Sequence, residues 1–139
     1  MAVWAADCAE RVIKYFEQSA PTDKRPRQAI EASRAWAHGE IGVAQARKAS
    51  VAAHAAAREA KEESARAAAR SAGHAVATAH MFEHARHAAD YALKAISNAT
   101  ENANKANTER EWQVQHLSAH LRPITFPDIK SPLIEGNSK

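Results

Sequence analysis

Apolar residues recur at spacings of three and four along most of this 139-residue chain, which is the period of an amphipathic helix. The first helix is predicted from Ala2 to about Gln18, and Pro21 marks the break after it. A second begins near Asp23, a residue type that caps helix N-termini. It ends near His38, because Gly39 fits the residue that follows a helix.

Alanine-rich segments predict further helices. The third runs from Ile41 or Val43 to Lys61, and the fourth from Ser64 to Thr78. The fifth ends near Asn98. A bend near residues 78–81 is favoured because one helix spanning both segments would be long for a small domain, but a continuous helix stays open. A sixth helix starts after residue 98, or at Thr108, and ends near Leu121.

These elements predict an all-α fold: an alanine-rich, tightly packed bundle of five to six helices. Each alanine buries little apolar area, but small side chains let helices approach closely, and alanine has the highest helix propensity. Residues 1–122 are expected to form one helical-bundle domain. Residues 123–139 contain three prolines and are predicted to be an irregular, extended tail that packs on the bundle or on a partner subunit.

Composition points to a soluble protein. The formal net charge is +3, and basic residues are mixed with acidic ones along the predicted helices, so we do not expect nucleic acid as a partner. The N-terminus lacks the pattern of a signal peptide, and no stretch approaches the roughly 20 apolar residues of a membrane span. The single cysteine, Cys8, excludes an intrachain disulfide and is predicted to be buried and unreactive.

A histidine stripe is the sharpest candidate site. Four residues spaced by four, three and four would share one side of a helix: His80, His84, His87 and Tyr91. The pairs His80/His84 and His116/His120 are both four-spaced, so two helices side by side would offer four imidazoles to a divalent metal such as zinc. The alternative is a polar seam between core and solvent. No His-Glu-x-x-His motif or cysteine pair supports a metal site, and we expect no cofactor.

Other polar residues carry weaker signals. His74 follows Gly73 and would face the alanine core, where glycine allows a neighbouring helix to approach closely. His87 with Asp90 or Glu83 offers acid–base chemistry, but nothing supplies a nucleophile on a strained turn, an oxyanion hole or a glycine-rich phosphate loop. We therefore do not predict an enzyme.

The second helix has the densest charge pattern. Arg27 and Glu31 are four apart and are predicted to pair, and Arg34 lies three residues further on. Such pairs usually decorate a helix surface. The functional alternative is an arginine cluster that binds an acidic partner or a phosphate.

Two segments resemble a known family. They are Asp23-Lys24-Arg25-Pro26-Arg27 with the residues up to Ile41, and Ala72-Gly73-His74-Ala75-Val76 with the residues up to Ala92. The chain resembles the immunity-five-like family of bacterial polymorphic-toxin systems, from its first helix to about Leu117. The resemblance implies a small, helical, cytoplasmic bacterial protein that binds a cognate toxin domain and blocks it without catalysis. Formation of a homodimer is an alternative that the sequence leaves open. The resemblance carries no catalytic residues.

The candidate groove combines the family-like positions with the rest of the histidine stripe: Asp23, Arg25, Arg27, Glu31, Arg34, Trp36, His74, His80, His84, His87 and Tyr91. The alternative function is a metal- or small-ligand-binding helical protein that uses His80, His84 and His87, with hydrolysis as an option. In either case, clustered histidines repel one another once protonated, so we predict lower stability below about pH 6.5.

Overall fold

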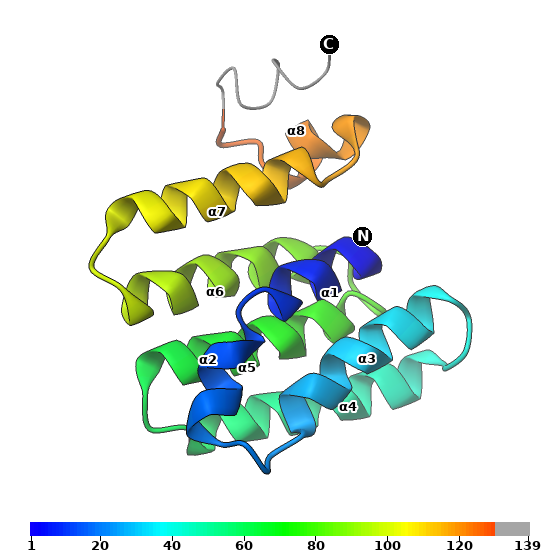
Figure 1. Ribbon diagram of the computed structural model, residues 1–139. Coiled ribbons are helices and arrows are strands. Elements are labelled where there is room, and N and C mark those ends of the chain that lie inside the picture. Colours follow the sequence, from blue (N-terminus) through cyan, green and yellow to red (C-terminus); the bar gives the residue numbers. More distant parts are fainter. Residues whose placement is uncertain (130–139) are drawn as a thin grey trace.

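The computed structural model describes residues 1–129, and all regular structure in this range is helical (Figure 1). The all-α prediction is confirmed, but the predicted count of five to six helices is wrong, because these residues form eight α-helices and one short 3₁₀ helix. The elements are α1 (Ala2–Glu10), α2 (Ile13–Ser19), α3 (Arg25–Ala37), α4 (Val43–Glu59), α5 (Glu63–Ala77), α6 (His84–Ala99), α7 (Ala103–Gln115), η1 (Ala119–Leu121) and α8 (Arg122–Thr125).

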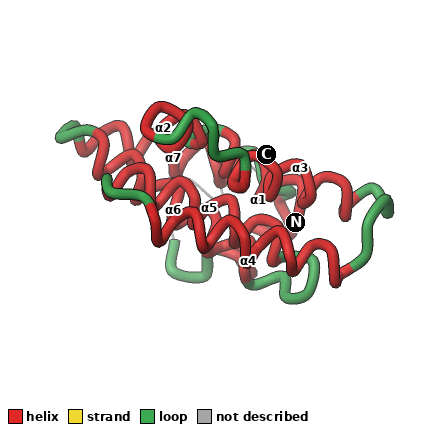
Figure 2. The backbone as a smooth tube through the Cα atoms, turned by 90° about the horizontal axis from the view of Figure 1, so that it is seen from below, coloured by secondary structure: helices red, strands yellow, loops and turns green. Residues whose placement is uncertain are grey.

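Helix α5 is the centre of the bundle. It lies between α4 and α6 and also contacts α1, α2 and α3 (Figures 1 and 2). Its buried side chains are nearly all alanine and cover most of its circumference, which is typical of a helix enclosed by others. Within residues 1–129, no helix is long and apolar enough to cross a membrane.

Buried serines join the central helix to its neighbours. Ser33 Oγ of α3 lies 3.1 Å from the carbonyl oxygen of Ala75, and Ser50 Oγ of α4 donates to the carbonyl of Gly73 over 2.9 Å. Ser71 Oγ of α5 donates to Ala88 of α6 over 2.7 Å. A hydroxyl can be buried at little cost when it finds such an acceptor, and the short side chain keeps the helix axes close.

The first predicted helix is divided at Arg11 and Val12, so the prediction of one helix to Gln18 is wrong. Val12 N–H donates to Ala9 over 3.1 Å and Tyr15 N–H donates to Val12 over 3.1 Å, which replaces the α-helical ladder by tighter turns. The change of direction lets α1 contact α3, α5 and α6, while α2 lies on α5. No proline or glycine marks this break in the sequence.

The start of α3 near Asp23 was predicted, but Asp23 is not its N-cap. Helix α3 begins at Arg25 with Lys24 at the N-cap position, and the Lys24 side chain makes no capping hydrogen bond. One residue earlier, Asp23 Oδ1 accepts a hydrogen bond from the backbone N–H of Arg25 over 3.1 Å. Gly39 has φ of +74°, and the N–H of Glu40 returns to the carbonyl of Ala35 over 2.9 Å, which closes the C-terminus. The bend near residues 78–81 is also confirmed: turns occupy residues 78–83, so a continuous helix is excluded.

The C-terminal part of the described chain contains helical segments that were not predicted. Helix α7 ends at Gln115 rather than near Leu121, and Arg122–Thr125 form a helix although this region was expected to be irregular. Pro123 is tolerated because it lies in the first turn, where its missing N–H is not needed. Phe126 is fully buried and meets Trp4 edge-on with 5.9 Å between ring centroids. The remaining residues of the expected tail, 130–139, lie outside the described range.

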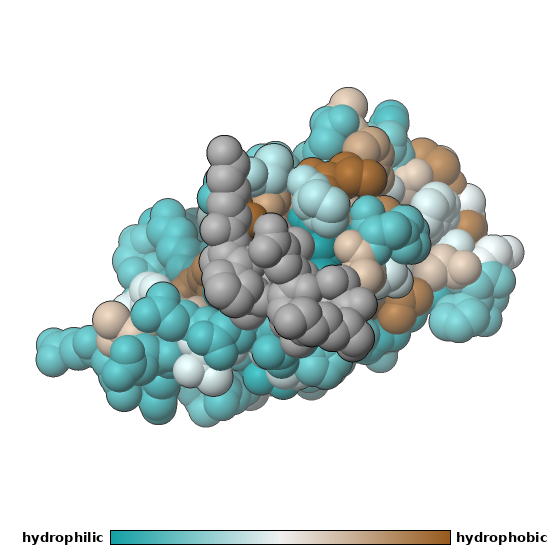
Figure 3. Space-filling model, turned by 90° about the horizontal axis from the view of Figure 1, so that it is seen from above, coloured by the Kyte–Doolittle hydropathy of each residue, from teal (hydrophilic) through white to brown (hydrophobic). Residues whose placement is uncertain are grey.

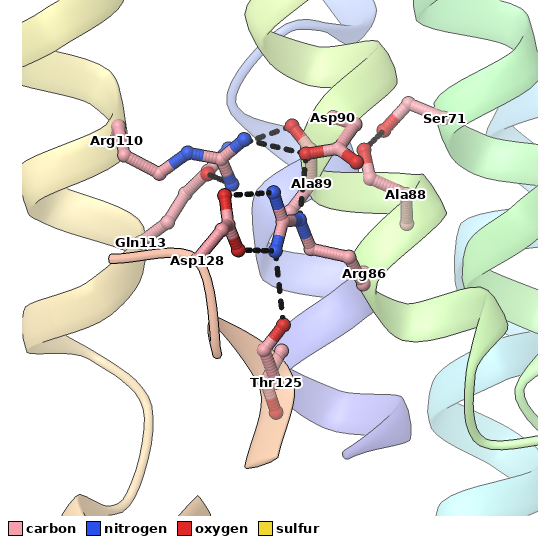
Figure 4. A network of polar contacts seen from close by, with 9 residues as sticks. All are labelled: Ser71, Arg86, Ala88, Ala89, Asp90, Arg110, Gln113, Thr125 and Asp128. Carbon is pink, nitrogen blue, oxygen red and sulfur yellow. Dashed lines mark hydrogen bonds and ion pairs between the residues drawn. The ribbon is translucent and has the colours of Figure 1, made fainter. Parts of the chain in front are cut away.

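A polar network fastens this segment to α6 and α7 (Figure 4). Arg86 donates to Asp90 (2.8 Å), to the carbonyl of Thr125 (3.0 Å) and to Asp128 (2.8 Å). Arg110 of α7 donates to the same Asp90 carboxylate. The guanidinium carbon atoms of both arginines lie over the ring of Phe126, at 4.7 and 4.8 Å from its centroid. The segment is therefore held by charge and by an aromatic anchor together.

Candidate functional site

The structure gathers five imidazoles from three helices and one turn. We call His54, His74, His80, His84 and His87 the imidazole cluster. His84 and His87 lie on α6 and His80 in the turn before it, yet the His80 and His84 ring centroids are only 5.5 Å apart. The predicted stripe is thus brought together, although its first member is not helical.

His74 of α5 is the centre of the cluster. Its ring is stacked on Tyr91 of α6, with centroids 5.2 Å apart and planes inclined by 9°, and lies 5.2 Å from the ring of His87. Its Nδ1 lies 2.9 Å from Nδ1 of His84. One of these two nitrogen atoms must donate and the other accept, so the contact requires complementary tautomers and at least one neutral ring.

His54 belongs to the cluster but was not predicted. It reaches from α4, and its ring meets that of His74 at 4.9 Å. Arg70 Nη1 donates to His54 Nδ1 over 2.8 Å, which requires an unprotonated Nδ1 because a guanidinium only donates. Gly73 provides the room: a Cβ at this position would lie 2.7 Å from His54 Nε2. A glycine inside an alanine-rich helix was the available signal that something large lies opposite.

Burial and neighbouring positive groups lower the pKa of three members of the cluster, His54, His74 and His84. Burial, followed by the charge of Arg70, lowers the pKa of His54 to about 4. Burial and the neighbouring histidines, chiefly His54, lower the pKa of His74 to about 3. Burial also lowers the pKa of His84. The ordinary value for histidine is about 6.5, so the folded chain binds fewer protons here than an unfolded chain.

The second histidine pair does not join this cluster. Because α7 ends at Gln115, the four-residue spacing of His116 and His120 does not place them on one helix face. The His116 ring is stacked on Trp112 with 4.1 Å between centroids, and His120 lies in η1. Across the described chain, no group of three or more His, Cys, Asp or Glu side chains is placed to hold a metal ion.

The family-like arginines form ion pairs between elements. Arg25 pairs with Asp23 at 2.6 Å and with Glu59, 34 positions further along the chain, at 2.8 Å. Its hydrogen bonds hold the pKa of Asp23 below the usual value. Trp36 is partly buried against the core. These residues stabilise the packing of α3 on its neighbours.

The predicted Arg27–Glu31 pair is wrong. Arg27 instead pairs with Glu10 of α1 and Glu17 of α2, and Arg34 pairs with Glu10 and Asp7. Glu31 is exposed and has no ion pair among residues 1–129. The carboxylates of α1 and α2 offer Arg27 a fork of acceptors, which a single neighbour on its own helix cannot match.

Two hollows continue the cluster along α6. A polar hollow of about 190 Å³ between α5 and α6 is lined by Glu63, Arg66, Ala67, Arg70, Tyr91 and Lys94. An apolar hollow of about 300 Å³ is lined by Met1, Phe82, Glu83, Arg86, His87, Ile124, Thr125 and Pro127. Phe82 and Ile124 are 54% and 61% exposed. Figure 3, which faces α7 and α8, shows a mostly hydrophilic surface with apolar side chains gathered toward one end.

We call the strip from Phe82 through His87 and Tyr91 to Lys94 the α6 strip. His87, Tyr91 and Lys94 are four and three residues apart on α6, so they lie along one side of the helix between the two hollows. The strip combines an exposed aromatic residue, an imidazole, a phenol and a cation. The thiol of Cys8 is not expected to be reactive, because burial raises its pKa and suppresses the thiolate.

Fold and site together define an all-α protein whose exposed chemistry suits contact with another molecule. The chain belongs to the family described as "Imm-5 like putative immunity protein", whose model matches residues 1–120. The resemblance found in the sequence is thereby confirmed, and it extends slightly past Leu117. Comparisons with curated proteins and with solved structures give no match.

Proposed function

We propose that this chain is a bacterial cytoplasmic immunity protein that binds one cognate toxin domain and blocks it by stoichiometric protein–protein contact. The family match over residues 1–120 carries the proposal, because it spans nearly all of the described bundle. The side chains on the α6 strip support binding rather than catalysis. They provide an imidazole, a cation and apolar contact area without an activated nucleophile.

The α6 strip is the contact surface that we assign to this function. Stable interfaces centre on an apolar or aromatic anchor with a polar rim, and Phe82 beside Ile124 offers such an anchor. Arg25, Arg27 and Arg34 are committed to carboxylates of their own chain. They serve the contact by holding the helices in place.

Co-expression tests the proposal. The toxin domain encoded beside this gene is expressed alone and with the chain, and growth is followed together with the mass of the purified complex. We expect restored growth and a one-to-one complex by light scattering. Phe82→Ala should weaken both, while Val51→Ala, at a 62% exposed position on α4, should change neither. Failure of the wild-type chain to restore growth or to form a complex would reject the proposal. A mass of two chains without toxin would identify a homodimer.

The second candidate function is binding of a small ligand at His80, His84 and His87, or of a metal by two of these imidazoles, since no group of three is placed to hold one within residues 1–129. The observation in its favour is that burial lowers the pKa of His84, so a neutral imidazole, the form that metals bind, is available beside two others. Elemental analysis and melting with and without a chelator separate the two functions. Purified protein without metal, whose Tm a chelator does not change, would leave no support for the second.

A further inference from the structure

The polar hollow between α5 and α6 has an excess of positive charge. Three of its lining residues, Arg66, Arg70 and Lys94, are cations, and Glu63 is the one carboxylate among the lining residues. Glu63 pairs with Arg66 at 3.1 Å. Arg70 and Lys94 form no ion pair within residues 1–129. The hollow therefore presents two cations without a countercharge.

Arg70 is unusual among the arginines of this chain. Seven others are held by carboxylates: Arg11, Arg25, Arg27, Arg34, Arg66, Arg86 and Arg110. The partner of Arg70 is instead the imidazole of His54, which occupies one donor of its Nη1. A guanidinium has five N–H donors arranged as a fork that fits a carboxylate. Arg70 is only partly buried and so has donors left to offer.

The surrounding groups complete a carboxylate-binding geometry. Arg66 and Arg70 are four residues apart on α5, and Tyr91 and Lys94 are three apart on α6, so the two pairs line opposite sides of the hollow. Arg66 Nε is buried and has no acceptor within the described residues. The hydrogen bonding of the lining is thus incomplete. A volume of about 190 Å³ admits a side chain or two, not a folded element.

We propose that this hollow binds aspartate or glutamate side chains of an acidic segment of the partner protein. The inference deepens the proposed function and rests on it for the identity of the partner as a toxin domain. A carboxylate would accept hydrogen bonds from Arg70 and Arg66 and lie near the ammonium of Lys94. Such charge-assisted contacts between opposite charges set the register of an interface and speed association.

Binding of a carboxylate in this hollow would change the pKa values of the imidazole cluster through its contact with Arg70. The charge of this arginine helps to hold both His54 and His74 in the neutral form. A bound carboxylate offsets that charge, so protonation of His54 becomes easier. The pKa of His54 is therefore a readout of occupancy in the unaltered protein, provided that the ligand does not also reach Arg58, the other arginine whose charge lowers it.

A labelled hexaglutamate peptide is the probe, with hexaglutamine as its uncharged counterpart. Fluorescence anisotropy at low salt compares the wild-type chain with R66Q/R70Q/K94Q and with K14Q/R47Q/K48Q, which removes the same charge at exposed positions elsewhere. We expect hexaglutamate binding to weaken at least about tenfold in the first variant and less than about threefold in the second. Equal weakening in both variants, or hexaglutamine that binds as well as hexaglutamate, would overturn the proposal.

Two further measurements guard against a variant that folds poorly. NMR titration of the wild-type histidines should show a higher His54 pKa at saturating hexaglutamate, and an unchanged value would contradict the proposal. In the co-expression assay, wild-type rescue with equal rescue by R66Q/R70Q/K94Q would reject the acidic contact while leaving the immunity function intact. Peptide binding as expected, without wild-type rescue, would reject the immunity function and keep the carboxylate site.

Discussion

Replacing Gly73 by alanine tests whether the imidazole cluster is packed as described. Gly73 lies inside α5 and faces His54 of α4. A Cβ added there would lie 2.7 Å from Nε2 of His54, 2.9 Å from Cε1 and 3.0 Å from Cδ2. These distances are shorter than van der Waals contact, so the ring of His54 has to move. Its hydrogen bond with Arg70 resists that movement.

The size of the effect is a difference between two opposing contributions. In an unobstructed helix interior, glycine to alanine stabilises by about 1 kcal/mol. Overpacking costs about 1–3 kcal/mol, and the displaced ring also gives up a hydrogen bond worth about 1 kcal/mol. We therefore expect G73A to destabilise the chain by about 1–3 kcal/mol, or several degrees in Tm for a domain of this size.

A double-mutant cycle measured by urea unfolding separates the two contributions. The variants are G73A, H54A and G73A/H54A. In the H54A background the obstruction is gone, so the same glycine-to-alanine change should stabilise by about 1 kcal/mol, which reverses its sign. A stabilising G73A in the wild-type background, or an equal effect in both backgrounds, would refute the assigned contact between α4 and α5.

Three other predictions test stability. Lowering the pH from 7 to 5 should lower Tm, because the depressed pKa values of His54 and His74 stabilise the fold above about pH 6.5. This contribution is lost as the pH falls toward their folded-state pKa values. H74Q should flatten the dependence of Tm on pH, and a wild-type Tm that does not change with pH would contradict the reasoning. Phe126→Ala should cost about 3–5 kcal/mol in urea unfolding, since the ring is fully buried against Trp4; an unchanged midpoint would show that the segment is dispensable. Arg25→Gln should cost less than about 1 kcal/mol, because its partner Glu59 is exposed; a larger loss would reveal a coupled network.

Helix ends that depend on a local residue type were predictable. Gly39 adopts a backbone conformation that other residues avoid, so it can be recognised in isolation. Asp23 marks the start of α3 because its side chain accepts a hydrogen bond from the N–H of Arg25, although Lys24 is the N-cap. The break at Arg11 and Val12 has no such residue. Arg11 pairs there with Glu109 of α7, a partner 98 positions away, at 2.6 Å. Tertiary contacts set this break, and a pattern of neighbouring residues does not contain them.

The candidate site was likewise predictable where its residues lie on one helix and not where they come from different helices. The spacing of His84, His87 and Tyr91 was enough to place them on one side of α6, whereas His54 joins them from another helix. The Arg27–Glu31 prediction failed for a related reason. A pair four apart on one helix contributes only about 0.3–0.5 kcal/mol, so the carboxylates of Glu10 and Glu17 on neighbouring helices take the arginine.

The alanine core explains why polar residues carry so much of the information in this fold. Alanine side chains are nearly interchangeable in shape and say little about which helices should be neighbours. In this fold, the neighbours of each helix are specified by buried polar side chains that find a hydrogen-bond acceptor in one position only. Ser71 donates to the carbonyl of Ala88, and Gln113 donates to the carbonyl of Ala89. Because the helix axes lie close together, there is no room for long side chains between the helices, and these side chains lie at the edges of each helix pair instead. The border of α5 and α6 therefore holds imidazoles and cations where a leucine-rich bundle would hold apolar groups.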